Sequence, residues 1–90
     1  MFFVYVLHSK KDNNLYIGYS EDVHKRVTEH HAACVDATKH RRPLELIYYE
    51  AYIKQADALG REKFLKSGSG HRYLKKQLVS YYEDLSRPVK

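Results

Sequence analysis

The chain has 90 residues, of which 43% are apolar and 30% are charged, and its formal net charge at pH 7 is +5. This length and composition exclude a disordered chain and predict one compact domain over residues 1–90. No apolar run approaches the roughly 18 residues that a membrane-spanning helix needs. The positive charge favours an anionic partner, and nucleic acid is the first candidate.

The cysteine content and the N-terminal segment bear on the cellular compartment. Cys34 is the only cysteine, which rules out an intramolecular disulfide and is typical of a reducing compartment. The opening MFFVYVL is shorter than a signal-peptide core and has no basic residues before it. We therefore expect a cytoplasmic protein without membrane attachment, whose first residues already belong to the fold.

Two N-terminal segments have strand-like patterns. Residues 2–7 are apolar, aromatic and β-branched, and residues 15–20 alternate in character. A polar run with turn-forming residues separates them, which predicts a β-hairpin. Because successive side chains of a strand face opposite ways, Tyr16 and Gly18 should share a face from which Ile17 points away.

A helix is predicted to follow the hairpin. Ser20 supplies a capping hydroxyl, and the two acids after it suit the positive end of a helix dipole, so the helix should begin there and run to about His31. Val23 and His30 recur at helical spacing. Arg26 lies three residues after Val23 and four before His30, which places it beside the buried stripe.

Three further segments extend the pattern. Residues 32–42 have no clean period and read as a loop that ends in a basic cluster. Residues 44–52 are rich in β-formers and predict a third strand. Residues 55–66 predict a helix with Glu62 along its apolar stripe, although Gly60 weakens this helix by about 1 kcal/mol relative to alanine.

The C-terminal part is predicted to hold one more helix. Residues 67–70, SGSG, read as a break whose glycines can adopt positive φ, and residues 71–85 show helical spacing of apolar and aromatic side chains. The predicted order is β-β-α-β-α-α. This order is typical of an α+β domain with a small, three-stranded, mostly antiparallel sheet flanked by helices.

The hairpin and the first helix carry residues that resemble a known family. The triplet FVY ends at Tyr5, ten residues intervene, and YIG occupies 16–18; Arg26 follows eight residues after the glycine and His30 four residues later. This arrangement resembles the GIY-YIG endonuclease domain. Glu62, in a helix after the third strand, completes the pattern.

The resemblance extends over residues 2–78 and is closest to the small, single-domain, excinuclease-related (UPF0213-like) group. The second triplet matches the family motif, whereas Phe3 and Val4 replace glycine and isoleucine in the first. His31 stands where many relatives have asparagine. Several members also carry an asparagine near the C-terminal helix, and this chain has none after Asn14.

The resemblance implies a divalent-metal-dependent nuclease, and the residue types suit phosphodiester hydrolysis. Glu62 is a hard oxygen ligand for one Mg²⁺ or Mn²⁺ ion that keeps most of its waters. Arg26 offers donors matched to a phosphate. Tyr16 is implied as a general base toward the attacking water. Since a tyrosine is almost entirely protonated at neutral pH, Tyr16 either loses its proton in the site or only positions the water.

The other expected site residues orient or bind the substrate. Tyr5 can orient water or phosphate, His30 can hydrogen-bond Tyr16 or the phosphate, and Gly18 leaves room for the substrate backbone. The remaining predicted substrate-binding residues share a positive or titratable side chain: Lys39, His40, Arg41, Arg42, His71, Arg72, Lys75 and Lys76.

Each site residue also has a structural interpretation. Arg26 has a possible ion-pair partner in Asp22, and Glu62 has one in Lys66. Tyrosines are common in cores, and an isolated histidine is more often structural than catalytic. Two functions follow: a DNA endonuclease directed by substrate structure or by a protein partner, or a non-catalytic nucleic-acid-binding module. The choice between DNA and RNA and the oligomeric state stay open.

Overall fold

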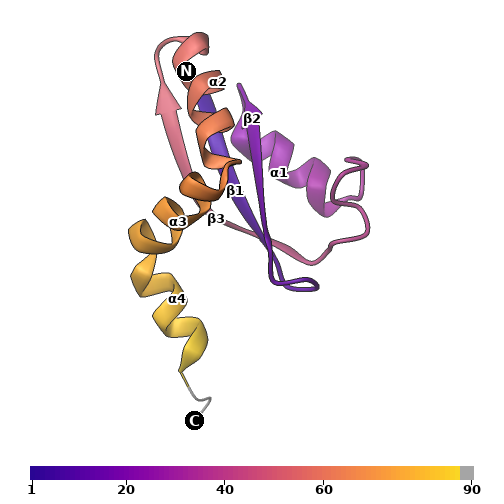
Figure 1. The fold of residues 1–90 in the computed structure, drawn as a ribbon. Helices are drawn as coiled ribbons and strands as arrows, with labels where there is room; N and C mark the ends of the chain where they lie inside the picture. Colours follow the sequence, from indigo (N-terminus) through magenta and orange to yellow (C-terminus); the bar gives the residue numbers. More distant parts are fainter. Residues whose placement is uncertain (88–90) are drawn as a thin grey trace.

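A computed structural model describes residues 1–87, as a three-stranded antiparallel sheet in the order β2-β1-β3 with four helices (Figure 1). The predicted α+β architecture is confirmed. Within residues 1–87 no helix is long and apolar enough to cross a membrane. The elements are β1 Phe2–Ser9, β2 Leu15–Ser20, α1 Val23–His31, β3 Leu44–Tyr52, α2 Gln55–Leu65, α3 Gly68–Gln77 and α4 Val79–Ser86.

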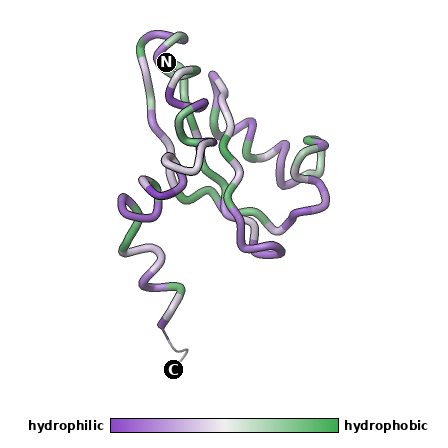
Figure 2. The backbone as a smooth tube through the Cα atoms, in the orientation of Figure 1, coloured by the Kyte–Doolittle hydropathy of each residue, from purple (hydrophilic) through white to green (hydrophobic). Residues whose placement is uncertain are grey.

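The predicted hairpin is formed by β1 and β2, and its register sets the two faces of the sheet. Tyr5 pairs with Gly18, and Leu7 pairs with Tyr16. Tyr16 therefore faces the same side as Tyr5, whereas Ile17 packs into the core on the opposite side. Figure 2 shows β1 as a largely hydrophobic stretch through the centre and the β1–β2 turn as hydrophilic.

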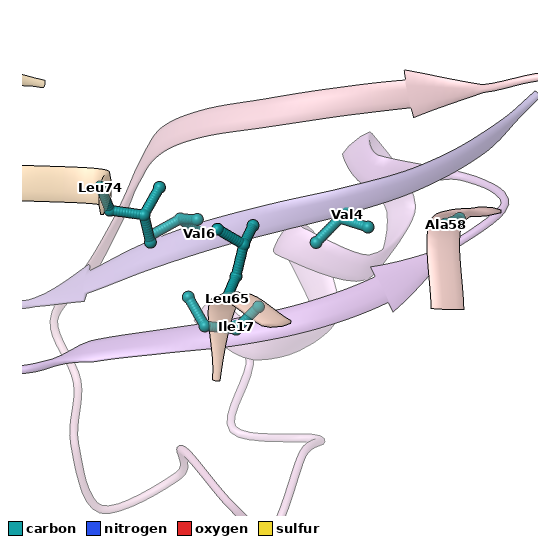
Figure 3. Close-up of a cluster of buried hydrophobic side chains, with 6 residues drawn as sticks. All are labelled: Val4, Val6, Ile17, Ala58, Leu65 and Leu74. Atoms are coloured by element: carbon teal, nitrogen blue, oxygen red, sulfur yellow. The ribbon is translucent and has the colours of Figure 1, made fainter. Parts of the chain in front are cut away.

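Two apolar clusters lie on opposite faces of the sheet. α2 and α3 cover one face, and α1 covers the other. The α2 face holds a fully buried cluster drawn in Figure 3: Val4, Val6, Ile17, Ala58, Leu65 and Leu74. The α1 face holds a smaller cluster with two side chains of α1 among its neighbours: Tyr5, Leu7, Leu44, Tyr16, Val23, Val27 and Leu46. The central strand β1 is thus buried on both sides.

The start of α1 corrects the predicted cap. Asp22, not Ser20, caps the helix, and its carboxylate accepts a hydrogen bond from the Lys25 backbone N–H at 3.0 Å. The Ser20 hydroxyl instead bonds the backbone of Asp22 in the turn before the helix. Both residue types cap helices well, and the cap falls two residues later because β2 continues through Ser20. The predicted end at His31 is confirmed.

The chain does break between two helices at residues 66–67, but the rest of the SGSG segment is helical and its glycines do not adopt the positive φ that the sequence allowed. Ser67 caps α3, Gly68 and Gly70 lie inside this helix, and neither glycine has a positive φ. A Cβ on Gly70 would lie 2.1 Å from the backbone oxygen of Phe64 and 2.4 Å from the Cα of Leu65. Glycine is therefore needed here for close contact between α2 and α3.

The predicted helix 71–85 is two helices. α3 ends at Gln77 and α4 begins at Val79, because Leu78 leaves helical geometry with φ −107° and ψ 34°. Leu78 packs against the core, whereas no residue of α4 is buried. The observed order is therefore β-β-α-β-α-α-α, and α4 projects away from the sheet (Figure 1).

Candidate active site

Three aromatic side chains from three elements meet on the α1 face of the sheet. His30 of α1 is fully buried, and its Nε2 lies 2.8 Å from the hydroxyl of Tyr5 on β1. Tyr16 of β2 contacts the same histidine, with ring centroids 5.1 Å apart, and its ring centroid is 6.4 Å from that of Tyr5. The structure thus brings together Tyr5, Tyr16 and His30, and the hydrogen-bond partner of His30 on the sheet is Tyr5 and not Tyr16, the partner that the sequence suggested.

Gly18 has a different role from the one expected. A Cβ added to Gly18 would lie 2.2 Å from Cζ and 2.3 Å from the hydroxyl oxygen of Tyr5. The Tyr5 ring therefore occupies the space that we expected the substrate backbone to fill. Because Tyr5 is the cross-strand partner of Gly18, the absent side chain allows Tyr5 to lie flat across β2.

The charges of Arg26 and Glu62 both act on the Tyr5 hydroxyl. Burial raises the pKa of Tyr5 to about 12, and the charge on Tyr16, when it is ionised, acts in the same direction. The Arg26 guanidinium lowers the pKa of Tyr5, and the Glu62 carboxylate raises it by a smaller amount. Side chains from α1 and α2 therefore both act on a hydroxyl of the central strand.

His30 is neutral at physiological pH. Burial, with a further contribution from the positive charge of Arg26, lowers the pKa of His30 to about 4. A neutral imidazole has one N–H donor and one acceptor nitrogen. His30 therefore contributes oriented hydrogen bonds to this site and not a positive charge.

Arg26 is available to an anion. Its partner is Glu29, with Nη1 3.1 Å from Oε1, and not Asp22, whose carboxylate caps the helix. The Arg26 side chain is 39% exposed, and an exposed pair at this spacing contributes only about 0.2–0.5 kcal/mol. A phosphate can therefore replace Glu29 at low cost.

Glu62 forms the ion pair that its structural interpretation predicts. Its carboxylate lies 3.2 Å from Nζ of Lys66, and its side chain is 20% exposed. Within residues 1–87 no group of three or more His, Cys, Asp or Glu side chains could hold a metal ion. A single accessible carboxylate fits one Mg²⁺ or Mn²⁺ ion that retains most of its waters, and it does not fit a two-metal centre.

A second cluster, which the sequence interpretation missed, fixes α2 to the sheet. Glu50 of β3 accepts hydrogen bonds from Arg61 of α2 at 2.9 and 3.0 Å, and also from the hydroxyls of Tyr48 and Tyr52. Arg61 immediately precedes Glu62. This bidentate pair therefore ties α2 to β3 one residue before Glu62.

The predicted basic loop is largely engaged in the fold. Arg41 forms a bidentate pair with Asp12, with the shorter contact at 2.6 Å. Arg42 donates to the backbone oxygens of Lys39 and His31. The Lys39 ammonium lies 3.3 Å from a carboxylate in the same loop, and His40 is exposed. Arg41 and Arg42 therefore hold the loop in place.

The basic residues of α3 lie elsewhere. His71 and Lys75 line a groove of about 730 Å³ between the β1–β2 turn and α3–α4, together with Asn13, Tyr82 and Arg87. Two more basic side chains of α3, Arg72 and Lys76, are exposed. The residues that line this groove include none of the five core site residues. The groove is therefore separate from the cluster around His30.

Residues 1–76 match the family model of the GIY-YIG catalytic domain. The chain belongs to the GIY-YIG family. The matched segment holds all five core site residues: Tyr5, Tyr16, Arg26, His30 and Glu62. The resemblance to this family that the two triplets suggested is thereby confirmed.

Similar proteins carry the name UPF0213. A UPF0213 protein of Staphylococcus epidermidis is 40% identical over 74 residues, which cover 81% of this chain and 89% of that protein. A UPF0213 protein of Haloquadratum walsbyi is 36% identical over 87 residues, which cover 96% of this chain and 94% of that protein. No solved structure matched the chain. The GIY-YIG family match suggests a nuclease, whereas the relatives' name states no activity.

Proposed function

We propose that this GIY-YIG protein is a divalent-metal-dependent endonuclease that hydrolyses phosphodiester bonds in DNA. The observation that carries the proposal is the cluster of Tyr5, Tyr16 and His30 with the charges of Arg26 and Glu62 acting on Tyr5. Structural roles explain these residues one at a time. They do not explain why a partly exposed arginine and carboxylate from two helices act on the same buried hydroxyl.

Each side chain has a defined part in the proposed reaction. Arg26 exchanges Glu29 for the scissile phosphate and stabilises the charge on its oxygens. Tyr16 directs the attacking water, either by taking its proton or by holding it in line. Within residues 1–87 the Tyr16 hydroxyl has no hydrogen-bond partner, in contrast to that of Tyr5, so it is free for this contact.

Glu62 would hold one Mg²⁺ or Mn²⁺ ion, with Lys66 released from its ion pair. Such an ion supplies positive charge beside the phosphate oxygens. Tyr5 and His30 form the floor of the site, where burial excludes water and strengthens electrostatic interactions.

We propose that the protein recognises the phosphate backbone and the structure of its substrate, and not the base sequence. The basic side chains of α3, with Lys39 and Arg42 at the surface of the basic loop, attract phosphates without reading bases. We therefore propose that substrate structure, such as a flap, branch, nick or damaged site, or a protein partner, directs cleavage, and that the protein acts in the cytoplasm in DNA repair.

Cleavage of a panel of end-labelled substrates tests the proposal. Single strand, duplex, 5′ flap, three-way branch and a matching RNA are incubated with Mg²⁺, Mn²⁺ or chelator. Wild type is compared with Glu62→Gln and with Asp57→Asn, an exposed carboxylate of the same helix. We expect metal-dependent cutting of a DNA substrate, which Glu62→Gln abolishes and Asp57→Asn retains.

The same cleavage experiment can also contradict the proposal. Equal background cutting by all three proteins, together with salt-sensitive binding, supports the non-catalytic binding module instead. The Glu62–Lys66 pair favours that alternative, because it shows that Glu62 already has a structural partner. A binding module should bind DNA equally well or better without the Glu62 charge.

A further inference from the structure

A buried hydrogen-bonded chain runs from the loop after α1 to the site. Thr38, in the loop between α1 and β3, is fully buried, and its Oγ1 lies 2.6 Å from Nδ1 of His30. Nε2 of the same ring lies 2.8 Å from the hydroxyl of Tyr5. Both nitrogens of His30 are therefore engaged, one on each side, by hydroxyl groups that can donate or accept.

The number of protons in this chain limits how it is arranged. The Thr38 hydroxyl, the neutral imidazole and the Tyr5 hydroxyl carry three exchangeable protons, but they form only two hydrogen bonds. One hydroxyl proton is therefore left over, either at the Thr38 end or at the Tyr5 end. Within residues 1–87 the Thr38 hydroxyl has no second hydrogen-bond partner. At the other end the Arg26 guanidinium, which can only donate, also acts on the Tyr5 hydroxyl oxygen.

The surroundings of the two ends differ. Thr38 is closed into its loop, with its backbone bonded to Val35 and Arg41, and a buried proton without an acceptor is unfavourable there. Tyr5 is buried too, but it lies against the half-buried Tyr16, and its hydroxyl is acted on by the Arg26 guanidinium and, by a smaller amount, by the Glu62 carboxylate. A proton left over at Tyr5 lies beside Tyr16, where an oxygen in the site can accept it.

We propose that Thr38 is a positioning residue that donates its hydroxyl proton to Nδ1 of His30 and so fixes the Nε2–H tautomer. Tyr5 then accepts a hydrogen bond from Nε2–H and keeps its own O–H proton for an oxygen in the site. Under the proposed nuclease function, on which only this last step depends, that oxygen belongs to the phosphate. Tyr5 thus acts as a donor, and Tyr16 is left as the group that contacts water.

Nitrogen NMR of ¹⁵N-labelled protein tests the tautomer directly, whether or not the protein cuts DNA. We expect His30 in the wild type to show a protonated Nε2 and an unprotonated Nδ1. Thr38→Val, which keeps the side-chain shape, should shift both ring signals toward the average of the two tautomers. Thr38→Ser should restore them, and Thr28→Val, on the exposed side of α1, should leave them unchanged.

Two results would overturn the proposal. One is a protonated Nδ1 in the wild type, and the other is an identical His30 tautomer in the wild type and Thr38→Val. In cleavage, Thr38→Val should lower kcat about tenfold with KM unchanged, and Thr38→Ser should recover most of the loss. A protein that cuts nothing but shows the expected NMR signals refutes the nuclease function and leaves the role of Thr38 supported.

Discussion

The hydroxyl of Tyr5 on the central strand lies 2.8 Å from Nε2 of His30 on α1, and both side chains are buried. This contact joins residues 25 positions apart and attaches the first helix to the middle of the sheet. Tyr5→Phe should lower the free energy of unfolding by about 1–3 kcal/mol, because it leaves a buried ring nitrogen without a partner. Tyr16→Phe should change it by less than about 0.5 kcal/mol. Urea unfolding measures both, and equal stability of the two variants would contradict this role for the Tyr5 hydroxyl.

Alanine substitutions at Gly18 and Gly60 test whether the Tyr5 ring needs the space that the missing side chain of Gly18 leaves. Gly18→Ala places a methyl group 2.2 Å from Cζ of Tyr5 and should destabilise the protein by about 1–3 kcal/mol. Gly60→Ala meets no atom within 4 Å and should stabilise α2 by about 1 kcal/mol. Thermal unfolding compares the two, and an unaffected melting temperature in Gly18→Ala would show that the ring moves aside freely.

Buried His30 should make stability depend on pH. Burial, with a contribution from the charge of Arg26, lowers its pKa from 6.5 to about 4, so the unfolded chain binds more protons between these values. The contribution is fully present above pH 6.5, is lost as the pH falls toward 4 and amounts to about 3 kcal/mol at most. His30→Phe should flatten this part of the stability profile, whereas His24→Gln, an exposed histidine, should not. Urea unfolding at about pH 7.5 and about pH 4.5 provides the test, and parallel profiles in all three proteins would show that His30 is not buried as a neutral ring.

Substitutions of Lys75 and Arg41 test phosphate binding and loop stability separately. Lys75 lines the groove beside α4 and is exposed, so Lys75→Gln should weaken DNA binding and reduce the salt slope by about 1 without loss of stability. Arg41→Gln breaks the pair with Asp12 and should cost about 0.5–1 kcal/mol of stability with a smaller effect on binding. Fluorescence anisotropy over a salt series gives the slopes. A larger loss of DNA binding in Arg41→Gln than in Lys75→Gln would indicate that the DNA binds at the loop.

Much of the fold could be predicted because the local patterns are strong. The period-2 alternation of β2 correctly placed Tyr16 and Gly18 on one face and Ile17 on the other. The helical spacing in α1 likewise predicted that Arg26, four residues before His30, lies beside the buried stripe of that helix. The cap of α1 was wrong because Ser20 and Asp22 both have capping side chains, and only the length of β2 decides between them.

The missed features depend on contacts between distant segments. Gly70 looks like a loop residue in the sequence, but its role is set by the backbone of α2, which lies against it. Glu50 and Arg61 occur in separate elements, and no local pattern indicates that they pair. Thr38 lies in a loop without periodicity, so nothing in the sequence distinguishes it from an exposed threonine. Gly18 was expected to leave room for the substrate, but the side chain that lies against it in the structure is Tyr5.

The most direct test of the proposed active site is the single-turnover cleavage rate of Tyr16→Phe, measured on the substrate that the wild type cuts best. Tyr16 has no hydrogen-bonded structural role within residues 1–87, so a loss of rate cannot be assigned to a loss of folding. We predict a rate at least about 100-fold below that of the wild type, with unchanged DNA affinity and stability. Equal rates in the two proteins, or no metal-dependent cutting by the wild type, would contradict the central claim.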